Sequence, residues 1–134
     1  MTTPSIFTRI IAGEIPCEKI LEDDRFFAFL DIRPIAPGHT LVIPKVQVDK
    51  LYEVDDATLA GLMPFAARVS RALERSVPCT RVGMIVAGFE VPHAHLHLVP
   101  IHGEGELTFA NAKPATKEGL AETAARIRAA LPAA

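Results

Sequence analysis

The sequence predicts an α+β fold: an antiparallel sheet of about five strands, packed by a short N-terminal helix and one long helix, with an extra C-terminal helix. Three observations predict this class. Short apolar segments joined by tight turns follow one another, which favours antiparallel pairing. One long segment has the apolar period of a helix. An alanine-rich segment near the end of the chain favours a further helix.

The first half of the chain predicts one short helix and three strands. The helix lies in the segment SIFTRIIAG, where Gly13 is a natural stop. Strands are expected at Glu18–Leu21, Phe26–Leu30 and His39–Ile43, and residues 31–38 must form a loop because they contain two prolines and a glycine. The apolar residues of the helix share one face: Ile6, Phe7, Ile10 and Ile11.

From Asp55 the apolar period becomes that of a helix, which this aspartate or the next one can cap. Pro64 lies inside the helix and should kink it or mark a late start. Two strands are predicted at Met84–Ala87 and His93–Val99, with a turn between them, and a helix at residues 116–131. The long helix should bury one stripe: Leu59, Leu62, Met63, Ala66, Val69 and Leu73.

The 134 residues predict a single domain, 1–134, with a core at about 5–103 and a C-terminal extension. The net charge of −2 argues against a sequence-independent nucleic-acid binder. No apolar run approaches the roughly 20 residues of a membrane span, and the N-terminus lacks the apolar core of a signal peptide. Cys17 and Cys79 are far apart and form no CxxC, as expected for reduced thiols. We therefore expect a cytoplasmic protein with no membrane and no nucleic-acid partner.

The segment VPHAHLHLVP carries three of the five histidines at alternate positions. On a strand these rings share one face, roughly 6.5–7 Å apart, while the residues between them point into the core. Such a row could be a solvated strand face, a metal site or a site of nucleophilic catalysis. Imidazole titrates near neutral pH, so one ring can attack phosphorus while another donates a proton. The chain has no HExxH and no paired cysteines, which disfavours metal.

HAHLHLV resembles the histidine-triad signature of the HIT superfamily of nucleotide hydrolases and transferases. The blocks SIFTRIIAGEIP and FFAFLDIRPIAPGHTLVIPK precede it in the family's order. The closing segment, from Phe109 onward, is similar to that of small actinobacterial members. The chain thus resembles a small bacterial, actinobacterial-type HIT-domain protein over most of its length.

The resemblance implies a role for each histidine of the motif. His95 matches the nucleophile that forms a nucleotidyl-histidine intermediate, and His97 the residue that contacts the transferred phosphate and assists the leaving group. His93 matches the residue that orients the nucleophile, and His39 supports the triad from a neighbouring strand. Asp31 matches the acid that hydrogen-bonds the ribose hydroxyls.

The resemblance also implies a substrate and a binding pocket. The substrate is a purine nucleotide conjugate, either a phosphoramidate or a dinucleoside polyphosphate, cleaved at its α-phosphate without a cofactor. A nucleotide-binding regulatory module with weak or no turnover is the alternative, and a metal-dependent hydrolase is a third. Backbone N–H groups near Gly88 are expected to bind phosphate. The apolar residues matching the pocket around the base are Ile6, Phe7, Ile10, Phe29 and Ile32.

The sequence departs from the family's pattern at two places. Phe89 and Glu90 stand where many relatives carry phosphate-binding side chains, so phosphate contacts come from the backbone, the substrate differs, or activity is weak. Ser5, Thr8 and Gln47 stand where some bacterial members bind a structural zinc, so we expect no metal. The family resemblance further implies a homodimer, with the helix at about residues 56–76 as the candidate interface.

Overall fold

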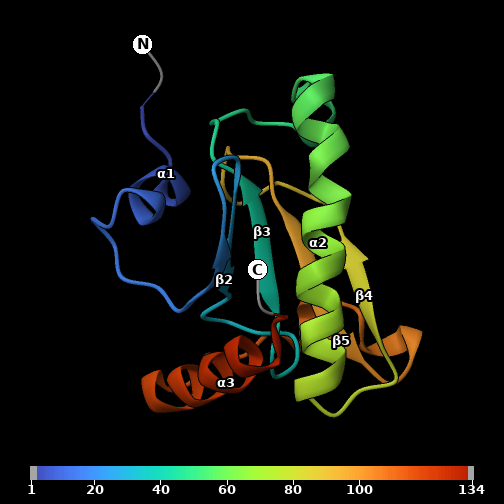
Figure 1. The fold of residues 1–134 in the computed structure, drawn as a ribbon. Coiled ribbons are helices and arrows are strands. Elements are labelled where there is room, and N and C mark those ends of the chain that lie inside the picture. Colours follow the sequence, from blue (N-terminus) through green and yellow to red (C-terminus); the bar gives the residue numbers. More distant parts are fainter. Residues whose placement is uncertain (1–2, 133–134) are drawn as a thin grey trace.

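The computed structural model describes residues 3–132, so the outermost residues of the expected 1–134 domain lie outside its description. Three helices accompany the sheet, α1 (Ile6–Ile11), α2 (Asp56–Ser76) and α3 (Lys117–Ala130), together with 3-10 turns at Leu51–Glu53, Glu104–Glu106 and Phe109–Asn111. The predicted fold class is confirmed (Figure 1). The antiparallel sheet has the order β1 (Lys19–Glu22), β2 (Phe26–Leu30), β3 (Thr40–Pro44), β5 (Leu96–Ile101) and β4 (Arg81–Ile85).

One face of the sheet carries the larger core and is covered by α2 and α3. Successive side chains of a strand point to opposite faces, which places Ala28, Val42 and Leu98 on this side. Val69 of α2 and Ile127 of α3 pack against them, and all five side chains are 0 % exposed. The C-terminal extension is therefore part of the main core.

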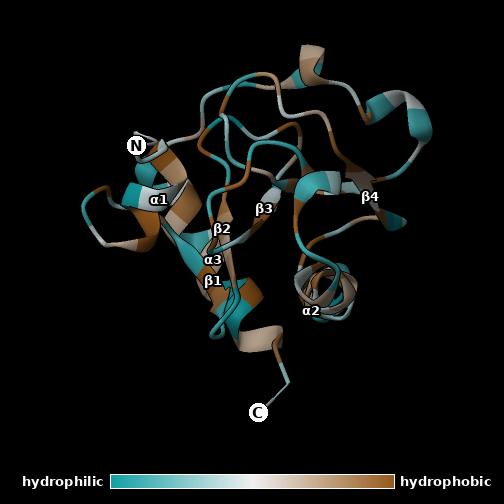
Figure 2. Ribbon diagram, turned by 90° about the horizontal axis from the view of Figure 1, so that it is seen from above, coloured by the Kyte–Doolittle hydropathy of each residue, from teal (hydrophilic) through white to brown (hydrophobic). Residues whose placement is uncertain are grey.

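The other face of the sheet is covered by α1 and by the chain after β5. Phe7 and Ile10 of α1 pack on Phe29 and Leu41, and Figure 2 shows α1 and α2 on opposite sides of the sheet. A further cluster on this side lies beneath the segment of residues 102–116 and contains Ile35, Val99, Ile101, Leu107 and Ala112. The histidine motif lies on this second face.

The last strand begins later than predicted. The expected strand at His93–Val99 is observed as Leu96–Ile101. Its neighbour β3 ends at Pro44, which has no N–H to continue the ladder. Ahead of the strand, the N–H of Ala94 donates instead to the carbonyl of Val48 at 2.6 Å. The residues before Leu96 are thus held by specific contacts rather than by sheet pairing.

The strand β4 lies earlier in the chain than the predicted Met84–Ala87. It occupies Arg81–Ile85 and pairs with β5 from Ile101 back to His97. The ladder ends at Ile85 because β5 itself begins one residue before His97. The predicted and observed strands share Met84 and Ile85, and the observed strand begins three residues earlier than predicted.

The long helix α2 is capped as expected but is not interrupted. A carboxylate oxygen of Asp55 accepts from the N–H of Thr58 at 3.1 Å, which caps the first turn. The helix continues through Pro64, so the expectation of a late start is wrong. Met63 is 51 % exposed rather than buried, because the helical period turns Phe65 to the core instead. No helix of the described residues is long and apolar enough to cross a membrane.

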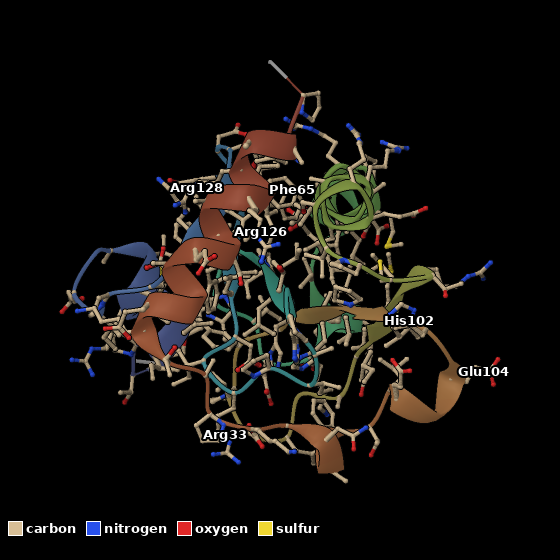
Figure 3. All side chains as sticks on the ribbon, turned by 90° about the horizontal axis from the view of Figure 1, so that it is seen from below. Arg33, Phe65, His102, Glu104, Arg126 and Arg128 are labelled. Carbon is tan, nitrogen blue, oxygen red and sulfur yellow. The ribbon has the colours of Figure 1, made fainter. Side chains whose placement is uncertain are left out.

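Replacing Ile127 by alanine tests whether α3 belongs to the main core. The side chain is 0 % exposed, so truncation should lower the free energy of unfolding by about 2–4 kcal/mol. Urea unfolding followed by circular dichroism measures the difference. The matched control is Arg126→Ala on the exposed side of the same helix (Figure 3), for which we expect a change within about 0.5 kcal/mol. Equal stability of the two variants would show that α3 is only loosely docked.

Candidate active site

Four histidines from three segments meet on the second face of the sheet, and all are buried. Only His97 lies on a strand of the observed sheet, because β5 begins after the first two triad histidines. The prediction that three rings share one strand face is therefore wrong, although the rings do come together. The exposed fractions are His39 1 %, His93 0 %, His95 5 % and His97 6 %.

Both ring nitrogens of His93 are held by neighbours. The carbonyl of Pro44 lies 2.7 Å from Nε2, and a carbonyl can only accept, so Nε2 carries the hydrogen. Nδ1 is then the acceptor, and the hydroxyl of Ser5 donates to it at 2.8 Å. Burial lowers the pKa of His93, in keeping with a neutral ring.

Ser5, which donates to His93, belongs to a larger polar network around the start of α1. The hydroxyl of Ser5 also accepts from the N–H of Thr8 at 3.0 Å. The hydroxyl of Thr8 and the N–H of Ser5 both donate to Oε1 of Gln47 at 2.7 Å. The three residues that stand at the expected zinc positions thus form a hydrogen-bonded cluster with His93. That no metal binds here stays a prediction.

The ring of His95 has one nitrogen fixed and one free. Nδ1 lies 2.7 Å from the backbone carbonyl of His93, so Nδ1 carries the hydrogen and donates it. Nε2 is left with its lone pair. The ring of Phe7 contacts His95 edge-on at a centroid distance of 5.1 Å and holds its plane. This is the arrangement that a nucleophilic imidazole requires.

His97 and His39 form a directed pair. The N–H of Ile35 donates to Nδ1 of His39 at 2.9 Å, so the hydrogen of the neutral His39 ring is on Nε2. That Nε2–H donates to Nδ1 of His97, also at 2.9 Å. The remaining hydrogen of His97 is therefore on Nε2. Burial, with the charges of His39 and His95, lowers the pKa of His97 to about 3, and burial lowers that of His39 although Asp31 opposes the shift.

The free nitrogens of His95 and His97 reach solvent. Neither Nε2 has a hydrogen-bond partner within residues 3–132. In this part of the chain the single buried side-chain nitrogen or oxygen without a partner is Oγ of Ser70. The two Nε2 atoms must therefore be accessible, one as an acceptor and the other as a donor.

Asp31 lies beside the histidine pair. Its Oδ2 is 3.6 Å from Nε2 of His39, and its Oδ1 accepts from the N–H of Arg33 at 2.8 Å. Asp31, His39 and His97 offer three ligand atoms within 4.8 Å of one another, which is close enough to hold a metal ion. An ion would have to displace the hydrogen shared by the two rings, because the lone pair of His97 Nδ1 already accepts it.

The residues expected around the base separate into two groups. Phe7, Ile10 and Phe29 are packed together and buried, with the rings of Phe7 and Phe29 5.5 Å apart. Ile6 and Ile32 are 48 % and 69 % exposed and stand free to meet a ligand. The structure thus buries the first group, with Phe7 against the rings of His93 and His95, and leaves the second group exposed.

The turn before the triad, residues 87–91, has backbone N–H groups that are unpaired within the described residues, whereas its side chains do not fill the site. Gly88 has a φ of +82°, with open space around it. Phe89 is 97 % exposed and Glu90 is also exposed, so neither side chain fills the site. Within residues 3–132, the backbone N–H groups of residues 87–91 have no hydrogen-bond acceptor. These amides are available to an anion.

Two contacts of the site had no signal in the sequence. The ring of Phe109 lies edge-on to His97 at a centroid distance of 5.0 Å. The amide of Ile35 fixes the proton of His39. A cavity of about 540 Å³ lies beside the site and is lined by Asp31, His39 and the start of α3, but the cavity does not include His95 or His97.

Comparisons with known proteins identify the family of the chain. The family model of the HIT domain matches residues 12–104. Protein hit of Bacillus subtilis is 36 % identical over 106 residues, which is 75 % of this chain and 73 % of that protein. An adenosine 5'-monophosphoramidase of Saccharomyces cerevisiae is 40 % identical over 100 residues, 74 % of this chain and 63 % of the yeast protein.

Solved structures share the fold over nearly the whole chain. A Hit-like protein from Bartonella henselae superposes with a TM-score of 0.84 at 33 % identity, covering 95 % of this chain and 96 % of its own. A zinc-bound histidine triad family protein from Mycobacterium smegmatis gives 0.80 at 32 % identity, covering 93 % and 91 %. With its fold, its histidine motif and these relatives in agreement, the chain belongs to the HIT domain family.

Proposed function

We propose that the protein hydrolyses purine nucleotide conjugates at the α-phosphate through a nucleotidyl-histidine intermediate, with phosphoramidates as the favoured substrates. The observation that carries this proposal is the fixed tautomer of His95. Its Nδ1–H is held by a backbone carbonyl, so in the neutral ring the lone pair is on Nε2, which is accessible to solvent. The relative that is an adenosine 5'-monophosphoramidase supports this substrate class.

In the first step, Nε2 of His95 forms a bond to phosphorus while the bond from phosphorus to the leaving nitrogen breaks. The ring of His95 becomes cationic, and the carbonyl of His93 that accepts from Nδ1–H stabilises the new charge. The departing nitrogen takes the bonding electron pair and leaves as an amine. In the second step, water supplies hydroxide to phosphorus and its proton to solvent, which releases the nucleoside monophosphate and neutral His95.

His97 acts in this scheme as a neutral hydrogen-bond donor. A cationic His97 would need a hydrogen on Nδ1, which would face the hydrogen on Nε2 of His39. The amide of Ile35 prevents His39 from moving its own hydrogen to Nδ1. Nε2–H of His97 therefore donates to an oxygen of the transferred phosphate, and the proton on the leaving nitrogen comes from solvent.

The phosphate oxygens would also be held by the turn before the triad. The unpaired amides of residues 87–91 can donate to them, in place of the side chains that Phe89 and Glu90 do not supply. The half-exposed Asp31 would accept from the ribose hydroxyls, with Ile6 and Ile32 at the rim beside the base. The binding of phosphate by backbone donors is the part of the proposal that is specific to this chain.

A homodimer is also part of this proposal. The apolar stripe of α2 is used by the protein's own core, which weakens the expectation that this helix is the main interface. The outer edge of β4 is unpaired, and Met84 and Val86 are 38 % and 52 % exposed beside it. Sedimentation equilibrium should give twice the chain mass of 14.5 kDa. A mass of one chain at micromolar concentration would contradict the dimer.

Replacing His95 by alanine should abolish turnover. Incubation of the wild-type protein with adenosine 5'-phosphoramidate should release AMP, and the variant should be slower by at least about a thousandfold, because no other ring has a free lone pair at this position. Chromatography of the nucleotides measures the rate. Intact-protein mass spectrometry of the quenched wild-type reaction should show a protein heavier by one nucleotidyl group.

The matched control is His102→Ala. His102 is the fifth histidine and lies exposed on the turn after β5, at the periphery of the molecule (Figure 3). Its removal should leave the rate unchanged. Full turnover by the His95 variant would rule out the covalent step, and tight binding of the nucleotide by wild-type protein without turnover would favour the regulatory module.

The burial of His97 predicts a loss of stability in mild acid. The pKa of this ring is about 3 in the folded protein, against 6.5 for an unperturbed histidine. Below pH about 6.5 the unfolded chain therefore binds a proton that the folded protein does not. The free energy of unfolding should fall from about pH 6.5 towards pH 3, by at most about 1.4 kcal/mol per pH unit for this ring. Urea unfolding over this range measures the slope.

The comparison variant is His97→Asn, whose amide oxygen can still accept from Nε2–H of His39. Loss of the titrating ring should make the fall of the unfolding free energy with decreasing pH shallower, by the amount that corresponds to about one bound proton. The His102→Ala protein should keep the wild-type slope, since its ring is exposed. Identical slopes for wild type and His97→Asn would show that His97 is not held neutral.

A further inference from the structure

The hydroxyl of Ser5 lies between the first helix and the histidine motif. Ser5 is the N-cap of α1 and is 6 % exposed, and its oxygen accepts from the N–H of Thr8 at 3.0 Å. Its single hydrogen has two acceptors within reach, Nδ1 of His93 at 2.8 Å and Oγ1 of Thr8 at 3.2 Å. The direction of this one hydrogen therefore decides whether His93 receives a hydrogen bond.

Gln47 fixes the hydrogens around Ser5. Its Oε1 accepts from the N–H of Ser5 and from the hydroxyl of Thr8, both at 2.7 Å. Its Nε2 donates to the carbonyl of Thr3 at 2.9 Å. The side-chain amide takes this orientation because the reverse would set its NH2 group against the N–H of Ser5 and its oxygen against a carbonyl. The hydrogen of Thr8 is therefore committed to Gln47.

His93 consequently depends on Ser5 for its second hydrogen bond. Nε2 of His93 already donates to the carbonyl of Pro44, so Nδ1 needs a donor. The hydroxyl of Thr8 is 3.4 Å away and directed to Gln47, whereas that of Ser5 is at 2.8 Å. His93 is 0 % exposed. Removal of the Ser5 hydroxyl would therefore leave a buried acceptor without a partner, which is costly enough to displace the ring.

The position of His93 matters because its carbonyl holds the ring of His95. Nδ1–H of His95 donates to this carbonyl at 2.7 Å. Residues 93–95 precede β5 and belong to no strand, so no sheet ladder keeps the carbonyl in place. The backbone contacts that do so are few: the N–H of His93 donates to the carbonyl of Val91 at 2.8 Å, and that of Ala94 to the carbonyl of Val48 at 2.6 Å. A shift of the His93 ring would therefore move the carbonyl on which His95 depends.

We propose that Ser5 is a positioning residue, whose hydroxyl holds His93 so that the carbonyl of His93 fixes the ring of His95. This inference rests on the proposed nucleotidyl transfer and adds a residue to it. Within the described residues, Ser5 makes no hydrogen bond to His95 or His97, so it acts through His93. A reacting nitrogen that is slightly misplaced slows the chemical step, while binding of the substrate is little changed. Loss of Ser5 should thus lower kcat and leave KM unchanged.

Three replacements of Ser5 separate the hydrogen bond to His93 from the capping of α1. With adenosine 5'-phosphoramidate, Ser5→Ala should lower kcat about ten- to a hundredfold, with KM within about twofold of wild type. Ser5→Gly also lacks the hydroxyl but is tolerated better than alanine at an N-cap, so it should be more stable than Ser5→Ala and equally slow. Ser5→Thr keeps the hydroxyl and the cap and should restore the rate. A wild-type kcat in Ser5→Ala, or a Ser5→Thr protein as slow as Ser5→Ala, would overturn the role of Ser5.

The matched control is Asp55→Ala, which removes the N-cap of the other helix, α2. Its carboxylate accepts from the N–H of Thr58 and, within residues 3–132, makes no hydrogen bond to a histidine. This variant should lose stability and keep the wild-type kcat, and circular dichroism melting curves show the stability of each variant. An equal loss of kcat in Asp55→Ala and Ser5→Ala would show that the rate follows stability alone, which would contradict the proposal.

Nuclear magnetic resonance of the histidine ring nitrogens tests the same role without turnover. In 15N-labelled wild-type protein, His93 should carry its hydrogen on Nε2 and His95 on Nδ1. In Ser5→Ala, the chemical shifts of the two nitrogens of His95 should become more alike, because the second tautomer is populated. Unchanged His95 signals would overturn the role of Ser5. Failure of wild-type protein to release AMP would instead contradict the proposed function, and the spectra would still decide whether Ser5 fixes the two rings.

Discussion

The hydrogen bond from Nδ1 of His95 to the carbonyl of His93 is the contact on which the candidate site depends. It decides which nitrogen of the buried neutral ring holds a hydrogen, and so leaves the lone pair that the proposed attack on phosphorus needs on the other nitrogen. That carbonyl is itself in place because the side chain of His93 is fixed at both nitrogens, by Ser5 of the first helix segment and by the end of β3 at Pro44. One backbone carbonyl thus links α1 and the sheet to the reactive atom.

At the pair of His39 and His97, a backbone N–H fixes the position of a ring hydrogen, as the carbonyl of His93 does for His95. The N–H of Ile35 donates to His39 and thereby sets the direction of the hydrogen bond to His97. Backbone groups cannot change their protonation, so each of them fixes the role of one nitrogen of the ring that it contacts. Burial works in the same direction, since it disfavours the charged form of His39, His93 and His97. In the proposed reaction, the proton for the leaving nitrogen therefore comes from solvent.

The sequence predicted the elements of this fold better than the details of the site. The spacing of apolar residues, together with capping residues, prolines and glycines, located α1, α2, α3 and the first three strands to within a residue or two. These signals act locally along the chain. The triad was misplaced onto a strand because alternation of His93, His95 and His97 also fits an irregular segment held by its own hydrogen bonds. Such bonds run to Ser5, Pro44 and Val48, more than 40 residues away, and leave no periodic trace.

Phe109 illustrates a different limit, and the reason lies in how the C-terminal extension is built. The family model ends at residue 104, before the turn that carries Phe109. In this chain that segment is fastened twice, by Leu107 and Ala112 on the face with the site and by Ala124 and Ile127 in the main core on the opposite face. The short turn at Phe109–Asn111 lies between Leu107 and Ala112, so it is held at both ends on the face with the site. The place of Phe109 beside His97 is thus set by contacts of the C-terminal extension, and the histidine motif by itself could not predict it.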